Sequence, residues 1–242
     1  MQKIKTNRLF LIGGSSILGN SIANSFLKQN LVTKVIKITR NEKLEKNNEF
    51  LYIDDYEKLD NILKEFEPTE GDIFLLAFAY LGSTGFSKNE YLSLEQSNQD
   101  KVFQINLFKM IKALNHSVEF LSKKGGTIIY LSSAAAYPPR GSNLPYALSK
   151  KFIDEILKAQ KNYFQLKNVN TLSVKIGFVD TPLNKGKKPT PFSSTPEKVA
   201  KLVLKAFDSK KSSAYIPKGI FLVTVILRIL KPITKYLDRK YS

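Results

Sequence analysis

The residues of this sequence best suited to chemistry are a serine, a tyrosine and a lysine, namely Ser133, Tyr146 and Lys150. The tyrosine and the lysine are four residues apart, so on a helix they lie on the same face. An ammonium beside a phenol favours the phenolate, so we expect Lys150 to lower the pKa of Tyr146 from about 10 toward neutral pH. Such a tyrosine gives a proton to a carbonyl oxygen or takes one from an alcohol, while the serine hydroxyl holds the same oxygen. The pattern predicts a proton-transfer site for carbonyl and alcohol chemistry.

The Tyr-x-x-x-Lys spacing alone does not identify the site, because the chain has eleven tyrosines and is rich in lysine. Three such pairs occur: Tyr146/Lys150, Tyr163/Lys167 and Tyr236/Lys240. The first pair alone follows an apolar, strand-like run that ends in a serine pair. Its position along the chain therefore singles it out.

A glycine-containing turn near the N-terminus predicts a second part of the site. Residues 8–12 read RLFLI, as in a buried strand, and the segment GGSSILG at 13–19 then leads into helix-like sequence up to Gln29. Glycines let the backbone approach a ligand, and the helix N-terminus offers free N–H groups and a positive dipole end. This arrangement favours a dinucleotide pyrophosphate over the alternative, an ordinary strand-to-helix turn. The predicted cofactor-binding residues here are Gly13, Ser15, Ser16, Ile17, Leu18 and Gly19.

The end of the second predicted strand bears on the choice of cofactor. An acidic residue there would accept a hydrogen bond from the adenosine ribose, but the strand ends with Thr39 and Arg40. Arg40 could instead pair with a 2′-phosphate, which favours NADP over NAD. The alternative is that Arg40 is simply solvated, which leaves NAD open.

Strands alternate with helices along the chain. We expect strands at 8–12, 34–39, 73–78, 127–132, 170–176 and 213–216, and helices at 17–29, 56–66, 95–122, 145–167 and 196–208. This alternation predicts an α/β fold, a Rossmann-like, doubly wound parallel sheet with ligands at the carboxyl ends of its strands. We expect one catalytic, dinucleotide-binding domain at 1–217 and a C-terminal amphipathic extension at 218–242.

Over residues 8–216 the chain resembles the short-chain dehydrogenase/reductase superfamily. The order agrees: a glycine turn, then Ser133, Tyr146 and Lys150. The resemblance implies that Asn106, in FQINLF, is the asparagine that holds a water of the proton relay. It also implies nicotinamide contacts from Val179 and Thr181, an adenine contact from Asp54, and further cofactor contacts from Ala77, Tyr146 and Lys150, with the lysine at the ribose. A homo-oligomer is expected as well.

The sequence departs from the superfamily pattern at two places, where Ile17 replaces a usual glycine and residues 76–79 read LAFA instead of Asn-Asn-Ala-Gly. Both departures recur in a narrower group, the reductases of decaprenylphosphoryl-2-keto-ribose, whose segments are similar to GGSSILG and AFAYLG here. That resemblance implies a ketone on a polyprenyl-phosphate-linked pentose as substrate, and a separate flavin oxidase as partner.

Composition excludes several classes of site. The chain lacks cysteine and has one histidine, His116, so it has neither disulfides nor thiol catalysis, and we expect no metal. A net charge of +17 suits nucleic acid, anionic lipid or a phosphorylated substrate. Because the sequence contains no nucleic-acid-binding motif, we do not expect a nucleic-acid partner. The N-terminal apolar run carries the glycine turn, so we interpret it as a strand rather than a signal peptide and expect a cytoplasmic protein.

Two further segments invite a functional interpretation. Residues 182–195 contain three prolines and three lysines, Lys185, Lys187 and Lys188, which predict either a phosphate-binding lid or a solvated loop. Residues 219–230 read GIFLVTVILRIL, too short for a bilayer span of about 20 apolar residues. With the basic residues that follow, this segment favours an amphipathic helix in a membrane interface over one that covers the core or a dimer contact.

The preferred hypothesis is an NAD(P)H-dependent reductase of a ketone on a sugar or lipid-linked sugar, with hydride from nicotinamide and the proton from Tyr146. The alternatives are a reductase of a soluble sugar or acyl ketone, and a non-catalytic, nucleotide-sensing scaffold at the inner face of the membrane. The intact set of Ser133, Tyr146, Lys150 and Asn106 argues against the scaffold.

Overall fold

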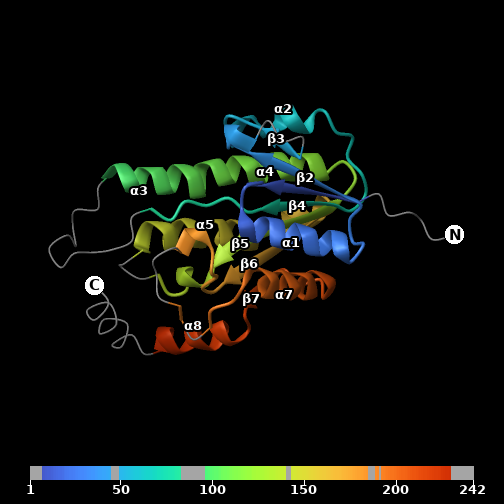
Figure 1. Cartoon of the computed structure of the whole chain (residues 1–242). Coiled ribbons are helices and arrows are strands. Elements are labelled where there is room, and N and C mark those ends of the chain that lie inside the picture. The colour runs from blue at the N-terminus through green and yellow to red at the C-terminus, as the bar shows by residue number, and fades with distance from the viewer. Residues whose placement is uncertain are drawn as a thin grey trace.

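The computed structural model describes residues 7–44, 49–82, 96–139, 143–184, 189–190 and 192–229. In this part of the chain one seven-stranded sheet has the order β3-β2-β1-β4-β5-β6-β7 (Figure 1). Each neighbouring pair is parallel. The strands are β1 (Arg8–Ile12), β2 (Lys34–Thr39), β3 (Phe50–Tyr52), β4 (Asp72–Leu76), β5 (Gly126–Ser133), β6 (Val169–Ile176) and β7 (Ser213–Ile216). The predicted doubly wound α/β fold is confirmed.

Helices cover both faces of the sheet, which explains why β1 and β4 are apolar over most of their length. They are α1 (Ile17–Lys28), α2 (Leu59–Leu63), α3 (Gln96–Phe103), α4 (Lys109–Leu121), α5 (Leu144–Ala159), α6 (Lys161–Leu166), α7 (Pro196–Asp208) and α8 (Gly219–Ile229). Successive residues of a strand point to opposite faces. In β1, Leu9 and Leu11 pack with residues of α1 and α7, whereas Phe10 and Ile12 pack with residues of α4 and α5.

The structure differs from the predicted elements in several places. The helix expected at 56–66 is a 3-10 turn, η2 (Tyr56–Lys58), followed by the short helix α2. The three-residue strand β3 was not predicted, because so short a run shows no periodicity. The long helix expected at 95–122 contains a π-helical segment, η3 (Gln104–Phe108), in which the Lys109 N–H bonds to the carbonyl of Gln104, five residues back. The helix expected at 145–167 divides at Gln160 into α5 and α6.

The strand order reverses between β1 and β4, which opens a crevice at the carboxyl ends of the strands. At this point Gly13 has φ of +97°, and a Cβ there would lie 2.8 Å from the backbone nitrogen of Phe78. Only glycine lets the turn after β1 lie this close to the segment after β4. The division of the chain into 1–217 and 218–242 stays a prediction.

Candidate active site

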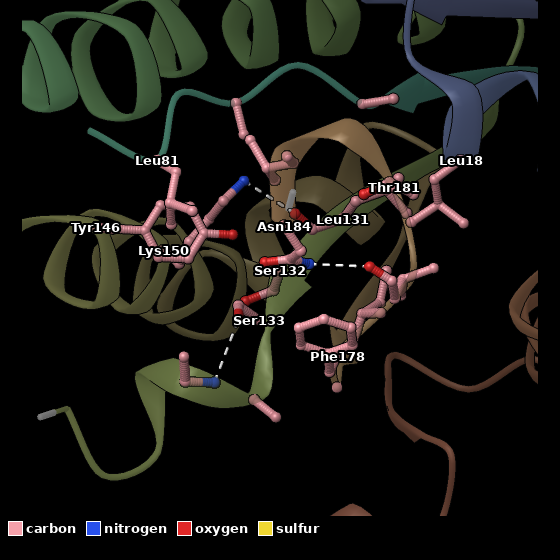
Figure 2. Close-up of a pocket in the computed structure, with 18 of the residues that line it drawn as sticks. Leu18, Leu81, Leu131, Ser132, Ser133, Tyr146, Lys150, Phe178, Thr181 and Asn184 are labelled. Atoms are coloured by element: carbon pink, nitrogen blue, oxygen red, sulfur yellow. Dashed lines mark hydrogen bonds between the residues drawn. The ribbon is translucent and has the colours of Figure 1, made fainter. Parts of the chain in front are cut away.

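A cavity of about 1090 Å³ lies along the carboxyl edge of the sheet. The turn after β1 lines one end, the end of β5 and the start of α5 line its middle, and the segment after β6 together with α8 closes the other side. Figure 2 shows Tyr146 and Lys150 side by side, with Ser132, Ser133 and Leu131 of β5 next to them. The cavity therefore joins the two parts of the site that the sequence predicted separately.

Hydrogen bonds to β2 and a side-chain cap of α1 fix the glycine turn. The N–H groups of Gly13 and Gly14 both donate to the carbonyl of Ile38 at 3.0 and 2.8 Å, and Ser16 caps α1 by accepting from the N–H of Gly19 at 3.0 Å. Of the predicted residues, Gly13, Ser15, Ser16, Ile17 and Leu18 line the cavity. Gly19 lies behind them, where a Cβ would lie 2.8 Å from Leu11 and 2.9 Å from Ala77. The rim of the turn is thus open to a ligand while its base is tightly packed.

Arg40 lies at the far end of the cavity, beside Thr39 and Asn41. Its guanidinium carbon is 5.1 Å from the ring centroid of Tyr56, a cation–π distance. Its Nε is buried and has no hydrogen-bond partner within the described residues. A buried, unpaired donor is costly, so this group is well placed to bind an anion.

The adenine contact expected of Asp54 stays a prediction. The exposed carboxylate of this residue is paired with Lys58 at 2.5 Å and does not line the cavity. The lysine lowers the pKa of Asp54 through that hydrogen bond. The next residue, Asp55, caps the short helix η2 (Tyr56–Lys58) and bonds to Lys109. Tyr56, which lines the cavity, is the aromatic group at this end.

Tyr146 and Lys150 lie on the buried face of α5, whose first turn contains Pro145, a residue preset for helix starts. The Lys150 ammonium donates to the carbonyl of Leu131 at 3.0 Å and lies 5.9 Å from the centroid of the Tyr146 ring. Ser133, the last residue of β5, lies next to them and accepts from the N–H of Ala135 at 3.2 Å. The first hydrogen bond ties Lys150 to β5, and the second holds the Ser133 hydroxyl at the end of that strand.

Burial dominates the electrostatics of this site. It raises the pKa of Tyr146 to about 12, and hydrogen bonding with Ser133 opposes the rise only in part. Burial also lowers the pKa of Lys150 to about 8, with the carboxylate of Asp154 acting in the opposite direction. The expectation that Lys150 would bring the pKa of Tyr146 toward neutrality is therefore wrong for this structure, because desolvation of the phenolate is the larger effect.

Asn106 is fully buried in the π-helical segment and does not line the cavity. Its amide donates to the carbonyl of Tyr80 and accepts from the N–H of the same residue, both at 2.7 Å. These two bonds fix the backbone that leads from β4 to Leu81, which does line the cavity. Its role in a water relay stays a prediction, whereas its hold on Tyr80 is direct.

The cofactor contacts expected after β4 and after β6 lie in the cavity wall. Ala77, Val179 and Thr181 all line it, and Asn184 donates to the carbonyl of Val179 at 3.0 Å, which fixes the segment after β6. The lysines at 185, 187 and 188 of the expected lid lie outside the described residues.

The substrate side of the cavity was not predicted from the sequence. It is mostly apolar and includes Leu81, Tyr137, Pro138, Phe178, Leu183, Phe192, Ile220, Val223 and Leu227. One polar group stands out, since the buried Oδ1 of Asn143 has no partner in the part of the chain that the structure describes. These residues come from four distant segments, so no local spacing could have united them.

Comparison with known proteins gives a consistent result. A family model described as short chain dehydrogenase matches residues 7–191. Uncharacterized oxidoreductases of two strains of Mycobacterium tuberculosis are similar, each 27% identical over 158 residues, which make up 64% of this chain and 61% of the relative. The chain thus spans about 61% of the length of the curated relatives it matches.

Solved structures show the same fold at low identity. A short chain dehydrogenase from Burkholderia cenocepacia in complex with NADP has a TM-score of 0.78 and 15% identity, with 96% of this chain and 97% of that chain covered. A 3-ketoacyl-(acyl-carrier-protein) reductase from Brucella melitensis complexed with NADH has a TM-score of 0.73 and 15% identity, with 90% and 99% covered.

The paired bonds between Asn106 and Tyr80 generate a prediction about stability. Asn106→Leu leaves the N–H and the carbonyl of the partly buried Tyr80 unpaired, so we expect a loss of about 1–3 kcal/mol in the free energy of unfolding. Urea unfolding followed by circular dichroism measures it. Asn24→Leu, on the exposed side of α1, is the control and should change little. Equal stability of the two variants would contradict the role assigned to the amide.

Proposed function

Since the chain belongs to the short chain dehydrogenase family, we propose that it is an NAD(P)H-dependent reductase of a ketone. The observation that carries this proposal is the convergence of Ser133, Tyr146 and Lys150 on one cavity with the glycine turn of α1. The four groups come from β1, β5 and α5, and a scaffold without catalysis has no need of a buried phenol–ammonium pair.

The cavity fits a nicotinamide dinucleotide. Gly13 and the residues after it present the N-terminal N–H groups of α1, which suit a pyrophosphate. Arg40, with its unpaired Nε, suits a 2′-phosphate, so NADP is the proposed cofactor and NAD the alternative. Val179 and Thr181 would hold the nicotinamide end. Such a cofactor supplies the hydride for reduction of a carbonyl group.

The protonation state of Tyr146 favours reduction over oxidation. With its pKa raised to about 12 by burial, the phenol keeps its proton at neutral pH and is a proton donor to a carbonyl oxygen. Lys150, with its pKa at about 8, remains largely protonated there and stabilises the phenolate left after transfer. Ser133 orients the carbonyl oxygen. The alkoxide that develops on the substrate is thereby neutralised by Tyr146.

For the substrate, we propose a ketone on a sugar, and more narrowly on a polyprenyl-phosphate-linked sugar. The unpaired Oδ1 of Asn143, three residues before Tyr146, suits a hydroxyl next to the reacting carbonyl. The apolar wall made by Phe178, Phe192 and α8 suits the start of an isoprenoid chain. A separate flavin oxidase would generate such a ketone from the alcohol. A soluble acyl or sugar ketone is the alternative.

We also propose that α8 rests on a membrane surface. Ile220, Val223 and Leu227 line the cavity, yet Phe221, Leu222, Ile226 and Ile229 on its outer side are exposed. Basic residues at 231, 235, 239 and 240 follow in the sequence. Apolar side chains and lysines together bind anionic lipid, each lysine adding about 1 kcal/mol.

Two further structural observations concern assembly and membrane topology. Leu148 and Phe152 on the outer side of α5 are exposed apolar residues that suit a homo-oligomer contact. Among the described helices, none has the length and apolar character that crossing a bilayer requires.

The proposed proton donor is tested by Tyr146→Phe, which keeps the ring and removes the hydroxyl. We expect dinucleotide affinity to persist and ketone turnover to fall by about 10²-fold or more, the scale of general acid catalysis. Steady-state kinetics and fluorescence titration measure the two quantities. Tyr163→Phe, in the exposed Tyr163/Lys167 pair, is the matched control. Turnover near the parent value in Tyr146→Phe would refute the assignment.

The cofactor preference is tested by Arg40→Ala. Loss of a charge-assisted contact costs about 1.5–3 kcal/mol, so NADPH affinity should fall by roughly 10- to 150-fold while NADH affinity changes little. Titration of both cofactors measures this difference. Lys43→Ala removes an exposed charge of η1 (Glu42–Leu44) nearby and should leave both affinities unchanged. If the parent binds both cofactors equally, Arg40 does not bind the phosphate.

The membrane contact is tested by substitution rather than by truncation after Pro217, because truncation would remove the cavity wall contributed by α8. Leu222→Glu combined with Ile229→Glu should reduce sedimentation with anionic vesicles at least tenfold. The parent should bind less as salt rises. Leu166→Glu, at the most exposed leucine of α6, should bind like the parent. If the parent protein does not sediment with anionic vesicles at low salt, the soluble ketone is favoured as the substrate.

A further inference from the structure

A buried carboxylate lies one helical turn beyond Lys150, on the same face of α5. Asp154 is 4% exposed and is bonded to residues of two strands and to the segment after β5. We propose that Asp154 is a positioning residue that holds the serine end of β5, the Tyr137 wall of the cavity and the lysine of α5 in one geometry. The proposal rests on the proposed function and adds to it a residue that does not touch the reacting atoms.

One carboxylate oxygen binds the elements nearest the site. Asp154 Oδ2 accepts from the Ser132 hydroxyl at 2.6 Å and from the Tyr137 hydroxyl at 2.9 Å. Ser132 directly precedes Ser133, and the ring of Tyr137 lines the cavity. Because neighbouring residues of a strand are fixed together, the bond to Ser132 sets the distance between the Ser133 hydroxyl and α5.

The other oxygen binds the next strands of the sheet. Asp154 Oδ1 accepts from the Ser173 hydroxyl of β6 and lies 3.5 Å from the ammonium of Lys175. Lys175 in turn donates to the hydroxyls of Ser173 at 3.0 Å and Ser213 of β7 at 2.9 Å. One carboxylate thus joins α5 to β5 and β6, and through Lys175 to β7.

Such a network is a poor source of stability, because well-packed apolar residues in place of a buried ion pair are often neutral or stabilising. Its effect is to fix one arrangement, since every alternative leaves a buried polar group unpaired. A buried network beside the proton donor therefore points to geometry as its purpose.

The charges around Lys150 suggest a second effect of the same residue. Facing its ammonium are Asp154 on α5, the phenols of Tyr146 and Tyr130, and the carbonyl of Leu131 on β5. Asp154 itself faces Lys175 of β6. Burial holds the pKa of Lys150 at about 8 and the Asp154 carboxylate keeps it from falling further. Without that charge, Lys150 would lose its proton at lower pH.

The test is Asp154→Asn in the full chain, with Asp72→Asn as matched control. Asp72 is also fully buried and ion-paired, with Arg8 at 2.6 Å, but lies at the opposite end of the strands from the cavity. We expect Asp154→Asn to lower kcat about tenfold, to leave the KM for the dinucleotide unchanged, and to move the alkaline limb of kcat to lower pH. Asp154→Glu should return the alkaline limb of the kcat–pH profile to its position in the parent. Asp72→Asn should lower the free energy of unfolding but leave kcat and the position of the alkaline limb unchanged.

A direct readout separates this inference from the proposed function. Carbon-13 NMR of labelled lysine, with Lys150→Arg to identify the resonance, gives the pKa of Lys150 without any turnover. A lower pKa in Asp154→Asn but not in Asp72→Asn supports the inference even if no ketone is reduced. An unchanged pKa and, where turnover is seen, an unchanged kcat would overturn it. If Asp154→Asn does not fold, Ser132→Ala and Tyr137→Phe replace it, because both variants keep the carboxylate. Each should lower kcat without changing the pKa of Lys150. An unchanged kcat would overturn the positioning role.

Discussion

The parallel sheet with its reversal between β1 and β4 is the constraint on which the site depends. Parallel strands bring all their carboxyl ends to one edge, and the reversal opens that edge between two neighbours. The opening is usable because Gly13, at φ of +97°, lets two turns approach closely there. The glycine turn, Ser133 and Thr181 come from distant parts of the sequence, and this topology places them around one cavity.

Burial at that edge determines the pKa values of the ionisable groups. Tyr146 and Lys150 are both nearly fully buried, and burial moves their pKa values in opposite directions, each toward the neutral form. A neutral phenol is an acid at neutral pH, while a lysine near its titration point is sensitive to any neighbouring charge. Asp154 supplies such a charge from one turn away, and its hydrogen bonds tie the same helix to β5, to β6 and to the segment after β5.

Local sequence patterns predicted most of the fold, because periodicity and glycine turns are local properties. Six of the seven strands were predicted. The strand β3 was not, because three residues are too few to show the alternation of apolar and polar residues. The spacing of Tyr146 and Lys150 also placed both side chains on one helix face, but spacing contains no information on burial, so the expected pKa of Tyr146 was wrong. Asp54 is exposed and paired with Lys58, and the adenine contact expected of it stays a prediction. The Asp154 network joins three strands and a helix that are separated in the sequence, so no single segment predicts it.

Helix α8 has two apolar faces, one turned to the cavity and one exposed. If the substrate is the lipid-linked ketone proposed above, its methylene groups pass from one apolar medium to another when it enters beside such a helix. The gain of about 0.8 kcal/mol per methylene that drives binding from water then largely cancels. Chain length would contribute almost nothing to selectivity, and recognition would fall to the few polar groups at the far end, where Asn143 and Ser133 lie. For such a substrate, binding would depend on the polar head group and hardly on the length of the chain.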